Sequence, residues 1–213
     1  MVAVGVFAGF TAYVGRAFLI RAIPSSPVGH VGPVNTKQVL VTVMPRRLPA
    51  RKGGAESRDG MAFEVTIRNG TDGDIRLLDD PRLPGLEATA SSLTIHYDVE
   101  DFPEGTDANV NIFRVPEQTI LRSGGTVTRR VEVPDPVRLS NWVGLHWDTS
   151  SSPPTYLRAA PSVPLGSRVT VEIVVGYGTV PFEYTTKTVP QDQRLAFLAW
   201  QRRANSTPIT IAR

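Results

Sequence analysis

Residues 168–177 read RVTVEIVVGY, and residues 62–69 read AFEVTIRN. In both segments apolar residues alternate with polar residues over most of the length. Successive side chains of a β-strand point to opposite faces, so this period of two is typical of a strand with one buried face. The two segments therefore predict half-buried strands and favour an all-β fold.

The same pattern recurs along much of the chain, at the spacing expected of a sandwich or barrel. Glycine-containing segments such as NGTDG (69–73) and SGG (123–125) supply the positive-φ positions that tight turns need. The high content of glycine and proline, 18 residues each, also favours turns and short strands over long helices. We predict nine strands, at 39–44, 62–69, 74–78, 92–99, 109–115, 125–133, 141–147, 168–177 and 179–189.

This arrangement resembles an immunoglobulin-like antiparallel β-sandwich over residues 38–190. The resemblance is architectural, because the chain has no cysteine and so lacks the paired cysteines of antibody domains. Trp142 and Trp147 fall on one predicted strand and, being five residues apart, point to opposite faces. One of them is expected in the core and the other at an edge or a partner, with Trp147 the interface candidate.

The amino-terminal residues 1–23 predict a membrane anchor helix. The run VAVGVFAGFTAYVG at 2–15 has no charge, and the apolar character continues past Arg16 and Arg21. A bilayer core requires about 20 apolar residues, and Arg16 can snorkel to an interface, so the anchor would be short or tilted. A cleaved secretory signal is disfavoured, because no basic residue precedes the run and no small-x-small site follows it. Alternating valines at the start leave a buried β-strand as an alternative.

Small residues line one face of this expected helix. Gly5 and Gly9 form a GxxxG pair, and Ala8 and Ala12 repeat the spacing beside it. Small residues let helix backbones approach closely in lipid, where packing drives helix association. We therefore predict packing on other transmembrane helices through Gly5, Gly9, Ala8 and Ala12, although such spacing also recurs by chance.

A linker rich in proline and glycine follows at 24–37, and it begins PSSPVGHVGP, which cannot continue a helix. Arg16, Arg21 and Lys37 all follow the apolar run, so the positive-inside tendency slightly favours a β-domain on the cytoplasmic face of an inner membrane. Tethered sandwiches often face outward, which keeps a periplasmic domain as the alternative.

Residues 191–213 form a carboxy-terminal helix and tail in this prediction. The segment QDQRLAFLAWQRRA at 191–204 consists of good helix formers, and its apolar residues share an arc. The helix either packs on the sandwich or docks on a membrane surface or a partner subunit, with Trp200, Arg202 and Arg203 at that interface.

The residues that carry chemistry do not gather into a recognisable motif. Without cysteine, thiol nucleophiles and thiolate metal sites are excluded. His30, His96 and His146 are far apart, and no GxSxG, SxxK, P-loop or GxGxxG pattern occurs. The acidic stretch 98–107 is the best metal candidate, for Ca²⁺, but it lacks EF-hand spacing and is more typical of a solvated loop. We therefore expect no enzyme activity, no metal and no cofactor.

The net charge of +3 does not indicate nucleic-acid binding, because basic and acidic residues lie in separate patches that largely cancel. Three functions remain. The first is a non-catalytic structural or accessory subunit of a membrane assembly, for example respiratory or photosynthetic. The second is a free-standing tethered binding module, and the third, less favoured, is a Ca²⁺-dependent domain. No small-molecule substrate is evident, so the expected partners are the membrane and other subunits.

Overall fold

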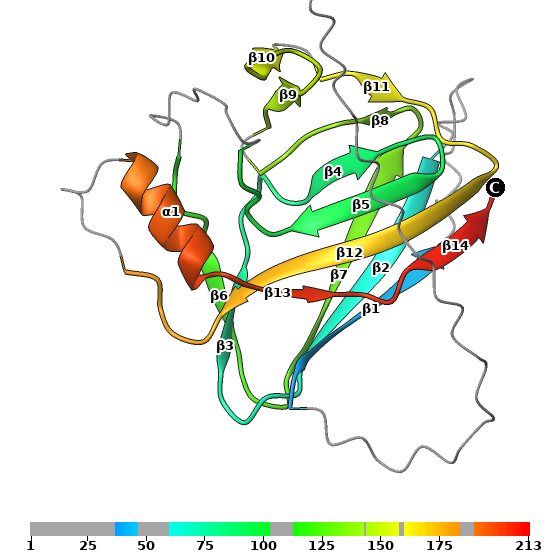
Figure 1. Ribbon diagram of the computed structural model, residues 1–213. Coiled ribbons are helices and arrows are strands. Elements are labelled where there is room, and N and C mark those ends of the chain that lie inside the picture. Colours follow the sequence, from blue (N-terminus) through cyan, green and yellow to red (C-terminus); the bar gives the residue numbers. More distant parts are fainter. Residues whose placement is uncertain (1–36, 47–59, 103–112, 143, 158–159, 184–189) are drawn as a thin grey trace, which may run out of the picture. The chain divides into compact units, whose positions relative to one another are not determined.

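A computed structural model describes residues 37–46, 60–102, 113–142, 144–157, 160–183 and 190–213. All of them fall within one compact unit, Thr36–Arg213. Strands dominate this unit, so the predicted all-β class is confirmed (Figure 1). The elements are β1 (Val39–Arg46), β2 (Gly60–Asn69), β3 (Ile75–Leu78), β4 (Gly85–Ala88), β5 (Ser92–Tyr97), β6 (Gln118–Leu121), β7 (Thr126–Pro134), β8 (Val137–Arg138), β9 (His146–Asp148), β10 (Thr155–Leu157), β11 (Ser162–Val163), β12 (Arg168–Gly178), α1 (Pro190–Trp200), β13 (Arg202–Asn205) and β14 (Ile209–Ala212).

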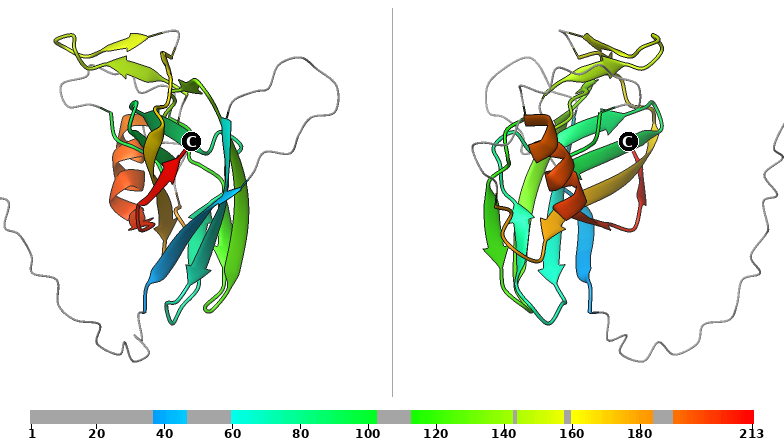
Figure 2. Two further views of the ribbon diagram at one scale, coloured as in Figure 1. Left: turned by 90° about the vertical axis from the view of Figure 1, so that its right-hand side faces the viewer. Right: turned by 60° about the vertical axis from the view of Figure 1, so that its left-hand side comes forward.

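Two sheets face each other in a sandwich-like arrangement (Figure 2). One is three-stranded, in the order β1-β2-β7, and the other is built around β12. Alternation in the sequence gives each sheet one apolar face, as in β1, where buried and exposed residues strictly alternate from Val39 to Met44. Burying these two faces against each other removes both from water.

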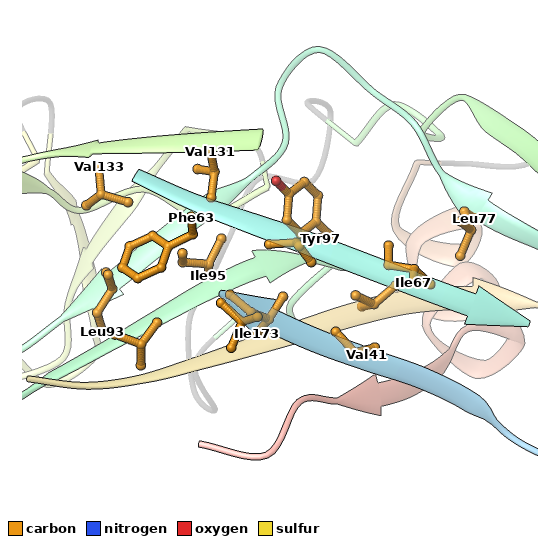
Figure 3. Close-up of a cluster of buried hydrophobic side chains, with 14 of the residues drawn as sticks. Val41, Phe63, Ile67, Leu77, Leu93, Ile95, Tyr97, Val131, Val133 and Ile173 are labelled. Carbon is orange, nitrogen blue, oxygen red and sulfur yellow. The ribbon is translucent and has the colours of Figure 1, made fainter. Parts of the chain in front are cut away.

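The core between the sheets is a single cluster of aliphatic and aromatic side chains. Phe63 and Ile67 from β2 meet Leu93, Ile95 and Ile173 from the facing sheet, and all five are fully buried (Figure 3). Burying one such side chain contributes about 1.5–3 kcal/mol, so this contact between sheets is the main source of the unit's stability.

Strand β12 is the centre of the larger sheet. Val174 pairs with His96 of β5 on one edge and with Asn205 of β13 on the other, so β12 is hydrogen-bonded along both edges. The pairing with β5 is parallel. The predicted wholly antiparallel sandwich is therefore wrong at this position, because the long chain between β5 and β12 allows a crossover that a hairpin does not.

Six of the predicted strands are present, at β1, β2, β3, β5, β7 and β12. The predicted strand 141–147 is wrong, because the chain turns at Gly144 with φ of 72° and a strand begins only at His146. The described parts of two others, 113–115 and 179–183, are irregular, and their remaining residues lie outside the described residues. Strands β4 and β6 were not predicted, and neither were the short strands β8, β10 and β11.

The carboxy-terminal helix ends earlier than predicted. Helix α1 ends at Trp200, and the following residues form β13 and β14, which both pair with β12 (Figure 1). The helix begins at Pro190, a favourable first position because proline has no N–H to leave unpaired. The prediction of a helix to 204 is wrong, and the tail after it forms strands, because backbone pairing with β12 prevails over local helix propensity.

Helix α1 packs on its own domain through a second hydrophobic cluster. Phe197 is fully buried and stacks with Phe113, Phe182 and Trp200 at ring-centre distances of 6.0, 4.9 and 4.9 Å. A Cβ atom at Gly178 would overlap the Trp200 ring, so only glycine at this end of β12 admits the indole. Of the two alternatives for this helix, packing on the sandwich is confirmed.

Among the described residues, no helix has the length and apolar character needed to span a bilayer. The expected anchor at 1–23, including Gly5, Ala8, Gly9 and Ala12, lies outside the described residues, as does most of the linker 24–37. The anchor and its packing face therefore stay predictions.

Candidate functional site

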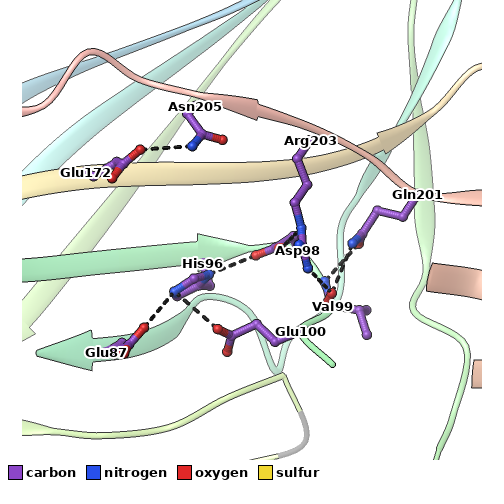
Figure 4. Close-up of polar contacts among 9 residues, drawn as sticks. All are labelled: Glu87, His96, Asp98, Val99, Glu100, Glu172, Gln201, Arg203 and Asn205. Carbon is purple, nitrogen blue, oxygen red and sulfur yellow. Dashed lines mark hydrogen bonds and ion pairs between the residues drawn. The ribbon is translucent and has the colours of Figure 1, made fainter. Parts of the chain in front are cut away.

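The outer face of β5 carries a cluster of charged side chains centred on His96, which we call the His96 group: Glu87, His96, Asp98 and Glu100. The alternation that buries Leu93, Ile95 and Tyr97 turns His96 away from the core. Asp98 and Glu100 follow at the same spacing of two, and both direct a carboxylate to the His96 imidazole (Figure 4).

Strand β4 brings a third carboxylate to the same imidazole. β4 pairs antiparallel with β5 in a register that sets Glu87 opposite Thr94, two residues before His96 and on the same face. Such diagonal neighbours lie within reach of long side chains. The Glu87 carboxylate consequently lies 3.6 Å from His96 Nε2.

The two imidazole nitrogens have different surroundings. Nδ1 is 3.0 Å from Asp98 Oδ1, a hydrogen-bond distance. Nε2 is 3.4 Å from Glu100 Oε1 and 3.6 Å from Glu87 Oε2, but it is enclosed and forms a hydrogen bond with neither. The His96 side chain is only 10% exposed, whereas Glu87 is 71% exposed and Glu100 27%. The three ligand atoms of Glu87, His96 and Glu100 all lie within 4.8 Å of one another, so this group can hold a cation.

Two residues that follow α1, Gln201 and Arg203, hold the backbone of Val99 beside the His96 side chain. Gln201 pairs with both backbone groups of Val99, at 2.8 and 3.0 Å, and Arg203 donates to the same carbonyl at 3.0 Å. Arg203 Nε also lies 2.6 Å from Asp98 Oδ2, an ion-pair contact without the alignment of a hydrogen bond. Because these contacts hold Val99 on both sides, the neighbouring carboxylates of Asp98 and Glu100 are kept towards the imidazole.

Gly176 of β12 leaves room for the side chains of Asp98 and Gln201. Gly176 pairs with Arg203 across the sheet, and a Cβ at position 176 would come within 2.9 Å of Asp98 Cβ and 2.6 Å of Gln201 Oε1. A larger residue would therefore push apart the side chains that position the carboxylates.

Charge and burial shift the proton affinities of the group. Burial acts to lower the pKa of His96, but the hydrogen bond to Asp98 and the charges of Glu100, Asp98 and Glu87 outweigh it, so the pKa lies above its ordinary value. Burial raises the pKa of Glu100, and the nearby Asp98 and Glu87 carboxylates add to this rise against the opposing effect of His96 and Arg203. The group therefore favours a positive charge at its centre.

An open hollow of about 330 Å³ adjoins the group. Its lining joins residues from β5, β12 and β13 that are distant in sequence: His96, Asp98, Glu100, Asp101, Val174, Arg203 and Asn205.

The predicted interface residues occupy three different places. Trp147, on β9, packs edge-on between Phe102 and Tyr156, at ring-centre distances of 5.4 and 6.1 Å. Trp142 is buried in the second hydrophobic cluster, so it is the core tryptophan of the pair. Trp200 packs inside its own domain and donates from Nε1 to the Val180 carbonyl.

The two arginines belong to β13 and are exposed. Arg203 reaches the His96 group, whereas Arg202 pairs through its backbone with Tyr177. Their predicted placement on a helix face is wrong, and their role at an interface stays a prediction.

The acidic stretch 98–107 was the best metal candidate in the sequence, and its described carboxylates turn to different partners. Asp98 and Glu100 face His96, and Asp101 pairs with Arg194, while residues 103–107 lie outside the described residues. His146 is on β9 and is not a member of the Glu87–His96–Glu100 group, and His30 is outside the described residues.

Sequence reasoning missed His96 as a centre of interactions. The available signal was the segment HYDVE at 96–100, in which alternation on a predicted strand places His96, Asp98 and Glu100 on one side. Glu87 carried no such signal, because its position depends on the register of the unpredicted strand β4.

Comparison with protein-family models, with curated proteins and with solved structures finds no match.

Proposed function

We propose that the protein is a non-catalytic accessory subunit of a larger membrane assembly. In this proposal residues 1–23 form a single anchor helix in an inner membrane, and the β-domain contacts partner subunits. The supporting observation is the uncharged run at 2–15 with its small-residue face, on the same chain as a compact β-domain. A β-domain placed beside a membrane by one helix is suited to contacts with neighbouring subunits.

The β-domain has a surface suited to such contacts. Trp147 packs edge-on against Phe102 and Tyr156, and Tyr156 is 47% exposed. Partly exposed tryptophan and tyrosine are enriched at protein interfaces, because they bury a large area at a low cost in conformational entropy. In this proposal the two sheets have an immunoglobulin-like arrangement. The β-domain lies on the cytoplasmic face of the membrane, which is slightly preferred over the periplasmic face.

Membrane fractionation tests the anchor. The full chain should stay with membranes after washing with high salt and alkaline carbonate, whereas a chain lacking residues 1–23 should be recovered folded in the soluble fraction. Recovery of the full chain in the soluble fraction of its native cells would refute the anchor and favour a strand at this position.

Substitutions in the small-residue face test helix packing. The double variant Gly5→Leu/Gly9→Leu should lose co-purifying subunits, because leucine side chains hold the facing helix away. Val14→Leu is the matched control, since position 14 lies on the opposite side of the expected helix. If the double variant retains its partners, the helix is only a tether and the β-domain makes the contacts.

A further inference from the structure

The Nε2 atom of His96 is enclosed by the protein but has no hydrogen-bond partner among the described residues. A buried polar atom without a partner is costly, about 1–3 kcal/mol, so such an atom in a folded protein usually has a specific role. Its side chain is nine-tenths buried, and the ring directs Nε2 between the carboxylates of Glu100 and Glu87 (Figure 4).

The hydrogen bond on the other side of the ring sets which nitrogen is free. Asp98 accepts at 3.0 Å from Nδ1, which places the proton of a neutral imidazole on that nitrogen. The lone pair of Nε2 then points to two carboxylates, an arrangement that repels unless Nε2 takes up a proton or a metal cation lies between them. A carboxylate that orients a histidine through its other nitrogen is the usual support of a metal ligand.

The distances around Nε2 fit a metal ion better than a shared proton. A hydrogen bond from Nε2 to a carboxylate would need about 2.7–3.2 Å, and both separations, 3.4 and 3.6 Å, exceed it. Four ligands at about 2.0–2.1 Å around a tetrahedral ion are roughly 3.3–3.4 Å from one another, close to these separations.

The charge of the group also matches a divalent ion. Arg203 is paired with Asp98, at 2.6 Å, which leaves the Glu87 and Glu100 carboxylates as the uncompensated charges next to the imidazole. Two negative charges and one neutral nitrogen neutralise an ion of charge 2+.

We propose that Glu87, His96 and Glu100 bind one divalent transition-metal ion of the Zn²⁺ type, with Asp98 as the residue that orients His96. Three protein ligands leave a fourth position for water, as in open zinc sites. Ca²⁺ and Mg²⁺ fit less well, because they take six or more oxygen ligands and rarely an aromatic nitrogen. The ion would tie β4 to β5 and to the chain that follows β5. This site shares Glu100 with the acidic stretch 98–107, but its other two ligands, Glu87 and His96, come from β4 and β5, and its metal is not calcium.

Titration calorimetry on the full chain in mild detergent, after removal of metal with a chelator, tests the proposal. ZnCl₂ at pH 7.5 should bind with about one ion per chain and a Kd of roughly 10 µM or tighter, and millimolar Ca²⁺ or Mg²⁺ should not displace it. Co²⁺ in place of Zn²⁺ should give visible absorption bands of four-coordinate cobalt.

Ligand variants and matched controls assign the site. His96→Gln should weaken Zn²⁺ binding by about 100-fold or more, and Glu87→Gln by at least about 10-fold. Glu87 is the safer test of the two, because its side chain is 71% exposed and its loss leaves the core intact. His146→Gln on β9 and Glu172→Gln on β12 should bind as the unaltered chain does.

Three results of these binding measurements would refute the proposal. A Zn²⁺ Kd weaker than about 10 µM would refute it, as would binding that Glu87→Gln leaves unchanged, or a stronger preference for Ca²⁺ than for Zn²⁺.

Discussion

Replacing Phe197 with alanine removes the side chain that joins helix α1 to the rest of the domain. Phe197 is fully buried and touches three other aromatic rings. Truncating a buried phenylalanine costs about 3–5 kcal/mol, through lost transfer free energy and the cavity that remains. Alanine returns about 0.5 kcal/mol, because it is the better helix former. The free energy of unfolding should therefore fall by about 2.5–4.5 kcal/mol.

Urea denaturation followed by circular dichroism measures this change, and Leu195→Ala is the matched control. Leu195 lies on the same helix but is 50% exposed, so its truncation should cost less than about 1 kcal/mol. If both variants lose the same small amount of stability, α1 is not docked through Phe197 and the second hydrophobic cluster is wrongly described.

Two further predictions concern the packing and the charges of the domain. Gly178→Ala should destabilise the domain by about 1–3 kcal/mol, because the added methyl overlaps the Trp200 ring. Gly73→Ala, with open space around it, should change the stability little. Equal effects of the two substitutions in urea denaturation would count against this packing. Arg82 donates a hydrogen bond to the Asp80 carboxylate and holds the pKa of that carboxyl below its ordinary value. The stability that this pair contributes is therefore present above about pH 4 and is lost as the pH falls through the lowered pKa. Asp80→Asn should therefore lower the free energy of unfolding by about 1–3 kcal/mol at pH 7 and flatten its decline below pH 4, and an unchanged acid profile would contradict the pairing.

Alternation of apolar and polar residues was enough to predict the long strands. In β1, β2, β7 and β12 the buried face is read directly from the sequence, because each of these strands has eight or more residues. β4, with the sequence GLEA, is too short for a period to show. Its position depends on pairing with β5, which local sequence does not specify.

The carboxy-terminal error has a different cause. Residues 201–204, QRRA, are acceptable in a helix, but β12 has an unpaired edge there, and the backbone of β13 satisfies it. The hydrogen bonds of Gln201 to Val99 reinforce the end of the helix at this point. Such pairing between residues 25 or more positions apart has no signature in a window of local sequence.

The candidate site could be predicted in part. The spacing of His96, Asp98 and Glu100 was visible in the sequence. The positions of Glu87 and Arg203 beside His96 depend on the pairing of β4 with β5 and of β13 with β12, which the sequence did not predict. Charged residues that converge from three strands are recognised only when the order of strands in the sheet is known.

The most direct test of the proposed function is to extract the full chain from its native membranes in a gentle detergent and measure what migrates with it. The account predicts a particle larger than one chain in its detergent micelle, containing other membrane subunits at a fixed ratio. That ratio should persist through a second separation by a different property, such as charge. Migration as a single chain without stoichiometric partners would contradict an accessory-subunit role and leave a free-standing tethered binding module in its place.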